Sequence, residues 1–233
     1  MRFNAKILLG GLCTLFASVV FTNSALAAGK PQYEVTITNV TKAQSFTPQL
    51  VVTHDDQVSL FTLGEPASLP VEIVAEAGDT GPLTAALEAL GNHVQEVTTI
   101  PVLLGPGETI SVTVEANGYR RYLSAIAMLI PTNDTFFAVN ALRLPAWGEV
   151  VTHSVAYDAG TELNDQNCAN IPGPHCGGAA HSPGPNAGDE GFVYISNGMH
   201  DLGEADADGN EILDPYIYDW RNPVAIIKVR RVK

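Results

Sequence analysis

The chain has 233 residues, of which 45% are hydrophobic, and its 12 basic and 25 acidic residues give a formal net charge of −13. This charge argues against a nucleic-acid-binding protein, because a polyanion would be repelled before contact. The hydrophobic fraction is ordinary for a globular protein and too high for a disordered one.

Residues 1–27 have the pattern of a secretory signal peptide. Two basic residues precede an apolar stretch from Ile7 to Phe21, and Ala25-Leu26-Ala27 is the small-x-small pattern of a cleavage site. The apolar stretch is too short, and has the wrong flanks, for a membrane span. We therefore expect a secreted or periplasmic protein with no integral membrane segment after cleavage, and one mature domain over residues 28–233.

Apolar runs along the mature chain predict a series of short strands. Tyr33, Val35 and Ile37 alternate with polar residues, which predicts a strand with one buried face. The almost wholly apolar run Tyr122–Ile130 predicts a central strand covered on both faces. Further strands are predicted at Val71–Ala75, Thr109–Glu115, Phe136–Leu142, Val150–Tyr157, Phe192–Ser196 and Val224–Val232.

One helix interrupts these strands. Apolar residues from Leu83 to Leu90 recur at i, i+3, i+4 and i+7, with Pro82 near the start and Gly91 at a plausible end. Because short strands and turn signals dominate, the expected fold class is all-β: an antiparallel β-sandwich with one short helix and long loops.

The region 164–191 shows no periodicity and is predicted to be a long loop. It contains Cys168 and Cys176, which are the remaining cysteines after signal-peptide cleavage. In an exported protein such a pair most simply forms a disulfide, which would stabilise the fold by roughly 2.5 kcal/mol. The same loop carries His175 and His181.

Three carboxylates stand in loops that follow strong strands. Asp134 follows the buried strand, while Asp158 and Glu162 follow the strand 150–157, and Gly160 lets the backbone between them fold back. Two carboxylates about 4 Å apart repel by roughly 4 kcal/mol at an effective dielectric near 20, so three in one pocket require protons or a cation. Ca²⁺ suits irregular loops with oxygen ligands. The alternative is three separate, solvated turn residues.

Several ordered blocks of the chain resemble the spondin domain in its short bacterial form, over roughly Tyr33 to Val232. These blocks are Leu60-Phe61-Thr62-Leu63-Gly64-Glu65-Pro66-Ala67-Ser68, Tyr122-Leu123-Ser124 to Pro131-Thr132-Asn133-Asp134, Tyr157-Asp158-Ala159-Gly160-Thr161-Glu162 and Asp219-Trp220-Arg221-Asn222-Pro223-Val224-Ala225. The resemblance implies a sandwich related in shape to C2 domains, with a calcium site at one end. It places the calcium-binding carboxylates at Asp134, Asp158 and Glu162, the last of which is usually aspartate in animal members.

A second acidic segment, Glu204 to Asp214, has the alternating oxygens and the glycine of an EF-hand loop. Its twelfth position is Pro215 instead of a bidentate glutamate, and no flanking helices are evident. The segment is therefore interpreted as a solvated acidic loop, with some other second calcium site as an alternative.

Two functions are compatible with these features. The leading hypothesis is an exported calcium-binding module for cell adhesion or for recognition of an extracellular or surface component of unknown identity. The alternative is a metal-dependent secreted enzyme, such as a hydrolase, although no nucleophile–base pair can be named. A third interpretation is purely structural: the ion stabilises the fold and the protein has no partner. Zinc held by His153, His175 or His181 close to the acidic loops would favour the enzyme.

Overall fold

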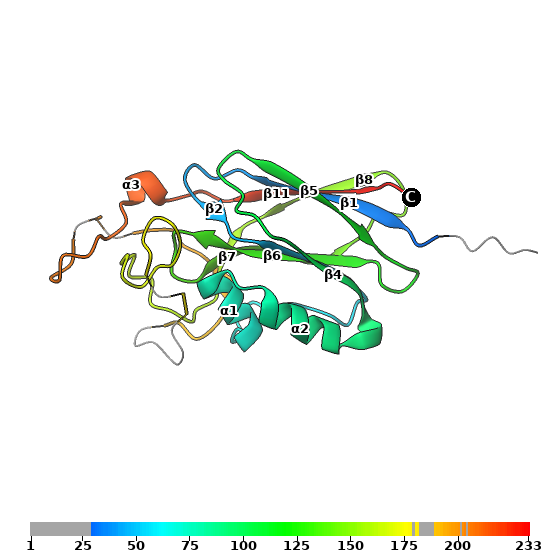
Figure 1. Cartoon of the computed structure of the whole chain (residues 1–233), viewed down its shortest axis with the longest axis horizontal. Coiled ribbons are helices and arrows are strands. Elements are labelled where there is room, and N and C mark those ends of the chain that lie inside the picture. Colours follow the sequence, from blue (N-terminus) through cyan, green and yellow to red (C-terminus); the bar gives the residue numbers. More distant parts are fainter. Residues whose placement is uncertain (1–28, 179, 182–188, 201, 204) are drawn as a thin grey trace, which may run out of the picture.

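Two antiparallel β-sheets packed face to face form the body of the protein in the computed structural model (Figure 1). The structure describes residues 29–178, 180–181, 189–200, 202–203 and 205–233. The predicted signal peptide lies outside these residues. The described part confirms the predicted all-β sandwich.

The first sheet has four strands in the order β5-β1-β11-β8, all antiparallel. In β1, Tyr33, Val35 and Ile37 point into the core as predicted, while the residues between them are half-buried. The strand bounds are β1 (Gln32–Asn39), β5 (Thr109–Glu115), β8 (Glu149–Ser154) and β11 (Ala225–Arg231).

The second sheet has the strand order β10-β9-β7-β6-β3-β4, and β2 pairs separately with β6. Its central strand β6 is buried from Leu123 onward, as its apolar run predicts. The strand bounds are β2 (Ser45–Phe46), β3 (Gln49–His54), β4 (Val94–Ile100), β6 (Tyr122–Ile130), β7 (Thr135–Arg143), β9 (Ala156–Asp158) and β10 (Tyr194–Ile195).

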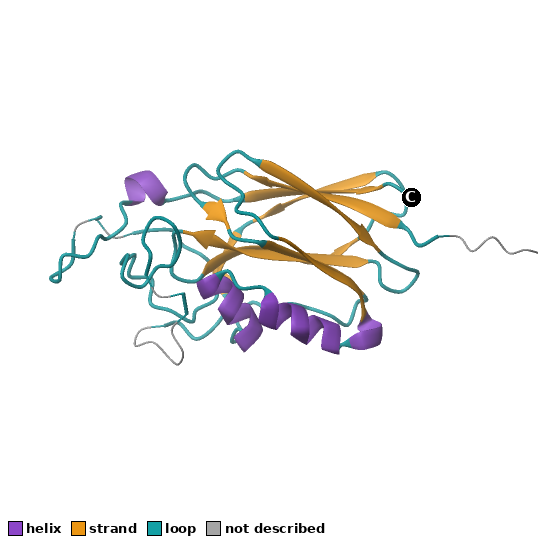
Figure 2. Cartoon of the chain, in the orientation of Figure 1, coloured by secondary structure: helices purple, strands orange, loops and turns teal. Residues whose placement is uncertain are grey.

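The second sheet has a core on each of its faces. Alternate residues of its strands, such as Leu123 and Phe137, pack between the sheets, while Ile126 and Phe136 pack beneath the helices. Two helices, α1 (Leu69–Ala77) and α2 (Gly81–Ala89), cover this outer face (Figure 2). A 3₁₀ turn (Gly91–His93) follows α2, and a short helix α3 (Pro215–Tyr218) precedes β11.

The prediction of a strand at Val71–Ala75 was wrong, because these residues lie within α1. The β-branched residues there suggested a strand, yet Val71, Val74 and Ala75 have helical i, i+3, i+4 spacing and all three are buried. The helix boundaries were also visible in the sequence. Pro70 stands in the first turn, and Gly78 ends the helix in the left-handed conformation with φ of 65°.

Strands β3 and β4 were missed by the sequence analysis. The buried β3 mixes polar and apolar residues without alternation, so no strand was predicted there. One of them, His54, is satisfied inside the sheet, since its Nε2 lies 2.8 Å from Ser124 Oγ. Hydrogen bonding of this kind allows a polar side chain to occupy a core position.

Different segments of the chain lie at the two ends of the sandwich. At one end the start of β1 meets the end of the chain, where Gln32 N donates to Lys233 O. The β6–β7 turn, the loops after β9 and α3 lie at the opposite end (Figure 1). The carboxylates predicted to bind calcium belong to this loop end.

Candidate metal centre

Asp134 is the last residue of the turn between β6 and β7, and its side chain is fully buried. Its Oδ2 accepts hydrogen bonds from the backbone N–H groups of Thr161, at 2.8 Å, and Glu162, at 3.1 Å. Its Oδ1 is buried and has no hydrogen-bond partner among the described residues. One oxygen of Asp134 is therefore fixed by the main chain, while the other is available to a ligand.

Asp158 lies beside Asp134 because β9 pairs with β7. Asp158 is the last residue of β9 and stands opposite Thr135 in the sheet. Its side chain is 1% exposed; Oδ1 accepts from Gly160 N at 3.0 Å and Oδ2 accepts from Asn164 Nδ2 at 3.0 Å. The sheet register thus brings together two carboxylates separated by 24 positions in the sequence.

The turn after Asp158 requires a glycine at position 160. Gly160 has φ of +65°, and a Cβ there would stand 2.3 Å from the carbonyl oxygen of Phe192. Ala159 N donates to Asp134 O at 3.2 Å, which fixes the start of the turn. The turn directs the next residues toward Asp134 and leaves Glu162 only 5% exposed.

The pocket raises the pKa values of its carboxyl groups. Burial raises the pKa of Asp134 well above its usual range, and the charge of Asp158 raises it further. Burial also raises the pKa of Asp158 to about 6, against the opposing hydrogen bonds from Gly160 N–H and Asn164. Without a cation, the pocket therefore favours bound protons.

Three residues near Asp158 were missed by the sequence analysis. Asn164 Nδ2 donates to Asp158 and lies 3.1 Å from Tyr194 Oη, and Tyr194 stands opposite Asp158 in the β9–β10 pair. The negative charge of Glu190 also raises the pKa of Asp158. The adjacent acidic residues Asp189 and Glu190 stand out in the sequence, but their spacing does not predict that Glu190 lies near Asp158 in β9.

The donor chemistry of the pocket fits a hard divalent cation. Asp134, Asp158 and Glu162 offer oxygen atoms alone, on irregular turns, and these are the ligands that Ca²⁺ prefers. The three side chains are not among the groups of described residues whose ligand atoms all lie within 4.8 Å of one another. The buried Oδ1 of Asp134, which lacks a protein partner among the described residues, is the group that such an ion would satisfy.

In the described part of the acidic segment 204–214, no helix precedes the acidic residues, and the helix that follows, α3, has only four residues, so the segment lacks the helix pair of an EF-hand. Asp206 Oδ1 accepts from the backbone N–H groups of Asp208 and Asn210, and its Oδ2 accepts from the amides of Asn210 and Asn167. Hydrogen bonds from Asn210 lower the pKa of Asp206 to about 2. Both oxygens of its central carboxylate are thus occupied, which favours the interpretation as a solvated loop.

The predicted disulfide is confirmed, with an S–S distance of 2.08 Å between Cys168 and Cys176. The histidines of the same region lie apart from each other: His175 Nε2 is 3.2 Å from Glu211, while His181 Nδ1 is 2.5 Å from Glu76. The loop after β9 therefore connects to both α1 and the acidic segment.

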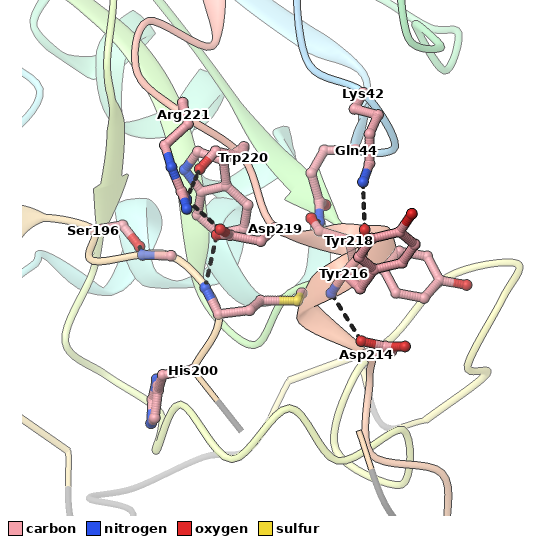
Figure 3. Close-up of polar contacts among 12 residues, drawn as sticks. Lys42, Gln44, Ser196, His200, Asp214, Tyr216, Tyr218, Asp219, Trp220 and Arg221 are labelled. Atoms are coloured by element: carbon pink, nitrogen blue, oxygen red, sulfur yellow. Dashed lines mark hydrogen bonds and ion pairs between the residues drawn. The ribbon is translucent and has the colours of Figure 1, made fainter. Parts of the chain in front are cut away.

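The block 219–225 anchors the loop end to the sandwich (Figure 3). Asp219 Oδ1 accepts from Met199 N at 3.2 Å, and the carbonyl of Tyr218 accepts from Gln44 Nε2 at 2.8 Å. Trp220 is buried in the core between the sheets, whereas Trp147 is 85% exposed. The resemblance of this block to the spondin domain thus falls on residues that support the fold.

This arrangement is an antiparallel β-sandwich with buried carboxyl groups in the long loops at one end. The chain belongs to the spondin family: the Spondin_N family model matches residues 33–166, which is more than half of the chain. The match includes Asp134, Asp158 and Glu162. No curated protein matches the sequence.

The family and the disulfide indicate an extracellular or secreted protein. Among the described residues, no helix has both the length and the apolar character needed to cross a membrane. Strand β11 lies beyond the matched residues, yet it pairs with β1 and β8 in the middle of the first sheet. The sheet therefore includes residues outside the matched segment.

Proposed function

We propose that this protein is an exported calcium-binding module in which Asp134, Asp158 and Glu162 hold one Ca²⁺. The ion stabilises the loop end of the sandwich, and this end recognises an extracellular or surface component in adhesion. The membership in an extracellular family supports this role.

The observation that carries the proposal is the state of the Asp134 carboxylate. It is fully buried, with one oxygen held by two backbone N–H groups and the other without a partner among the described residues. A buried ionised oxygen without a partner is unfavourable by several kcal/mol. A calcium ion removes that penalty and offsets the repulsion from Asp158.

The occupancy of this site and the stability of the protein should depend on the calcium concentration outside the cell. Extracellular modules bind Ca²⁺ with Kd values of about 0.1–1 mM, so occupancy follows the calcium of the medium. At about 100 times the Kd, linkage contributes about 2.7 kcal/mol to the free energy of unfolding. For a chain of this size, the Tm is expected to rise by about 5–10 °C.

The test is a calcium titration of the purified protein and its Asp134→Asn variant, with thermal melting in chelator and in excess Ca²⁺. Wild type should bind one Ca²⁺ and melt at a higher temperature with it. The variant should lose this calcium response. In chelator it should melt above wild type, because an amide at this buried position carries no charge beside Asp158.

The sign of the effect in chelator separates the proposal from a purely structural role. If Asp134 serves only to accept the N–H groups of Thr161 and Glu162, its replacement lowers the Tm in both conditions equally. Asp56→Asn is the matched control, since Asp56 is exposed in the turn after β3. Absence of calcium uptake by wild type would contradict the proposal.

A further inference from the structure

A second group of ionisable side chains lies on the helix-covered face, between α1 and the segment after the disulfide. Glu72 and Glu76 are four positions apart on α1, so their side chains lie on one face of the helix. His181 approaches them, with its Nδ1 2.5 Å from Glu76 Oε2. One ligand atom from each of the three residues lies within 4.8 Å of the other two.

This group is largely removed from water. Glu76 is 1% exposed, although it lies on a helix that packs against the sheet through Val71 and Val74, and the His181 side chain is 26% exposed. Charged groups are seldom this buried unless they are paired or coordinate a metal. Burial and the charge of Glu76 raise the pKa of Glu72.

One histidine side chain stands against two carboxyl groups here, so the group is suited to additional positive charge. Glu72 also lines a cleft of about 380 Å³ together with Pro66, Thr161 and Asp189. The cleft therefore gives an ion access from solvent to Glu72, one member of the group.

We propose that Glu72, Glu76 and His181 form a binding site for a divalent transition-metal ion of the zinc class. Imidazole nitrogen together with carboxylate oxygen is a donor set that Zn²⁺ accepts, whereas Ca²⁺ takes oxygen ligands. Three protein ligands leave the fourth tetrahedral position to water. The site shares no ligand residue with the proposed calcium site, and it does not depend on the proposed function.

Two observations distinguish this group from an ordinary surface ion pair. The three ligand atoms converge, and they come from two segments that the fold brings together across 105 positions between Glu76 and His181. Family membership does not account for the complete set, because His181 lies beyond the matched residues. The imidazole is thus supplied by this chain's own long loop.

The experiment is a zinc titration of the full protein, first treated with chelator and then supplied with millimolar Ca²⁺ to occupy the other pocket. Wild type should take up one Zn²⁺ per chain at this site. His181→Ala and Glu72→Gln should each weaken zinc binding by at least about a hundredfold, since loss of groups beyond the ligands already weakens it by 10–100-fold. His93→Ala is the matched control, because His93 Nδ1 also pairs with a carboxylate, 2.7 Å from Asp55 Oδ2.

Circular dichroism of the β-sheet serves as the measure of correct folding in each variant, because it does not require calcium binding. His181 and Glu72 are partly exposed, so both variants should keep the wild-type spectrum. Zinc binding that survives in both variants, or that is absent from wild type, would overturn the proposal. A His181 that acts only as an ion-pair partner would change the melting temperature and leave no zinc-dependent signal to lose.

Discussion

The two clusters of acidic residues described above are positioned in different ways. In the loop pocket, Asp134 and Asp158 accept hydrogen bonds from the main chain, so the turn around Gly160 sets their positions. In the α1 group, helical spacing places Glu72 and Glu76, and the third member is a side chain from a distant loop. The first group depends on backbone conformation, and the second depends on a side chain that can be replaced without disturbing a turn.

The two clusters also differ in the metal ion that their ligand atoms suit. The loop pocket presents oxygen atoms on irregular backbone, which matches the requirements of Ca²⁺. The α1 group adds an imidazole nitrogen, which shifts its preference toward Zn²⁺. Changes in the backbone should therefore affect calcium, and changes at His181 should affect zinc.

The largest effect is expected from Gly160→Ala. Its left-handed conformation and the contact of a new Cβ with the Phe192 carbonyl should lower the free energy of unfolding by about 3 kcal/mol or more. Calcium binding should be lost, because the displaced turn carries the N–H groups that hold Asp134. Zinc binding at the α1 group should remain. Chemical denaturation and separate titrations with the two ions measure these effects.

Gly91→Ala is the control for Gly160→Ala. Gly91 also has positive φ, of +55°, but nothing lies within 4 Å of a Cβ there. Its replacement should reduce stability by about 1–2 kcal/mol through backbone strain alone and leave calcium binding intact. Equal effects of the two substitutions would show that the turn does not set the pocket.

An intermediate effect is expected from pH. The pKa of Asp158 is raised from 3.8 to about 6 in the folded protein, so the folded state binds more protons than the unfolded state between these values. In chelator, this contribution to stability is fully present below about pH 4 and is lost as pH rises through 6. Calcium must displace the same protons. Its Kd should therefore increase about five- to sixfold from pH 6 to pH 5.

Melting curves in chelator and calorimetric calcium titrations across this pH range measure both quantities. Asp158→Asn provides the comparison, since the amide has no proton to lose at this position. A calcium affinity that is constant from pH 7 to pH 5 would argue against carboxylate ligands in this pocket.

The smallest effect is expected at the acidic segment that resembles an EF-hand loop. Asp208 is exposed there, and its backbone N–H donates to Asp206. Asp208→Asn should leave calcium stoichiometry unchanged and alter the free energy of unfolding by no more than about 0.5 kcal/mol. The loss of a bound calcium ion in this variant would show that the protein has a second oxygen-based site.

The sequence predicted those features that depend on local periodicity and on residues near strand ends. The alternation at Tyr33, Val35 and Ile37 and the apolar run of β6 indicated buried faces correctly. Two grounds predicted that Asp134 and Asp158 approach each other. Each lies near the end of a clearly predicted strand, and the resemblance to the spondin domain places both at one site. At α1, β-branched residues obscured a helical spacing that its terminal proline and glycine also indicated.

The remaining features depend on contacts that no local pattern records. Glu76 and His181 meet across 105 positions of the chain. Glu190 likewise approaches Asp158, since β10 pairs with β9. A long loop without periodicity has no sequence pattern that predicts which residues its side chains contact. These contacts are known only from the three-dimensional structure.

The contact between the start of β1 and the last residue has a practical consequence for binding assays. Gln32 and Lys233 lie together at the end of the sandwich opposite the loops that follow β6 and β9 (Figure 1). Immobilisation on a sensor chip through a C-terminal tag would therefore orient every molecule alike, with its loops facing the flow. Ion exchange and partner capture could then be recorded on one surface without the anchor shielding the residues under study.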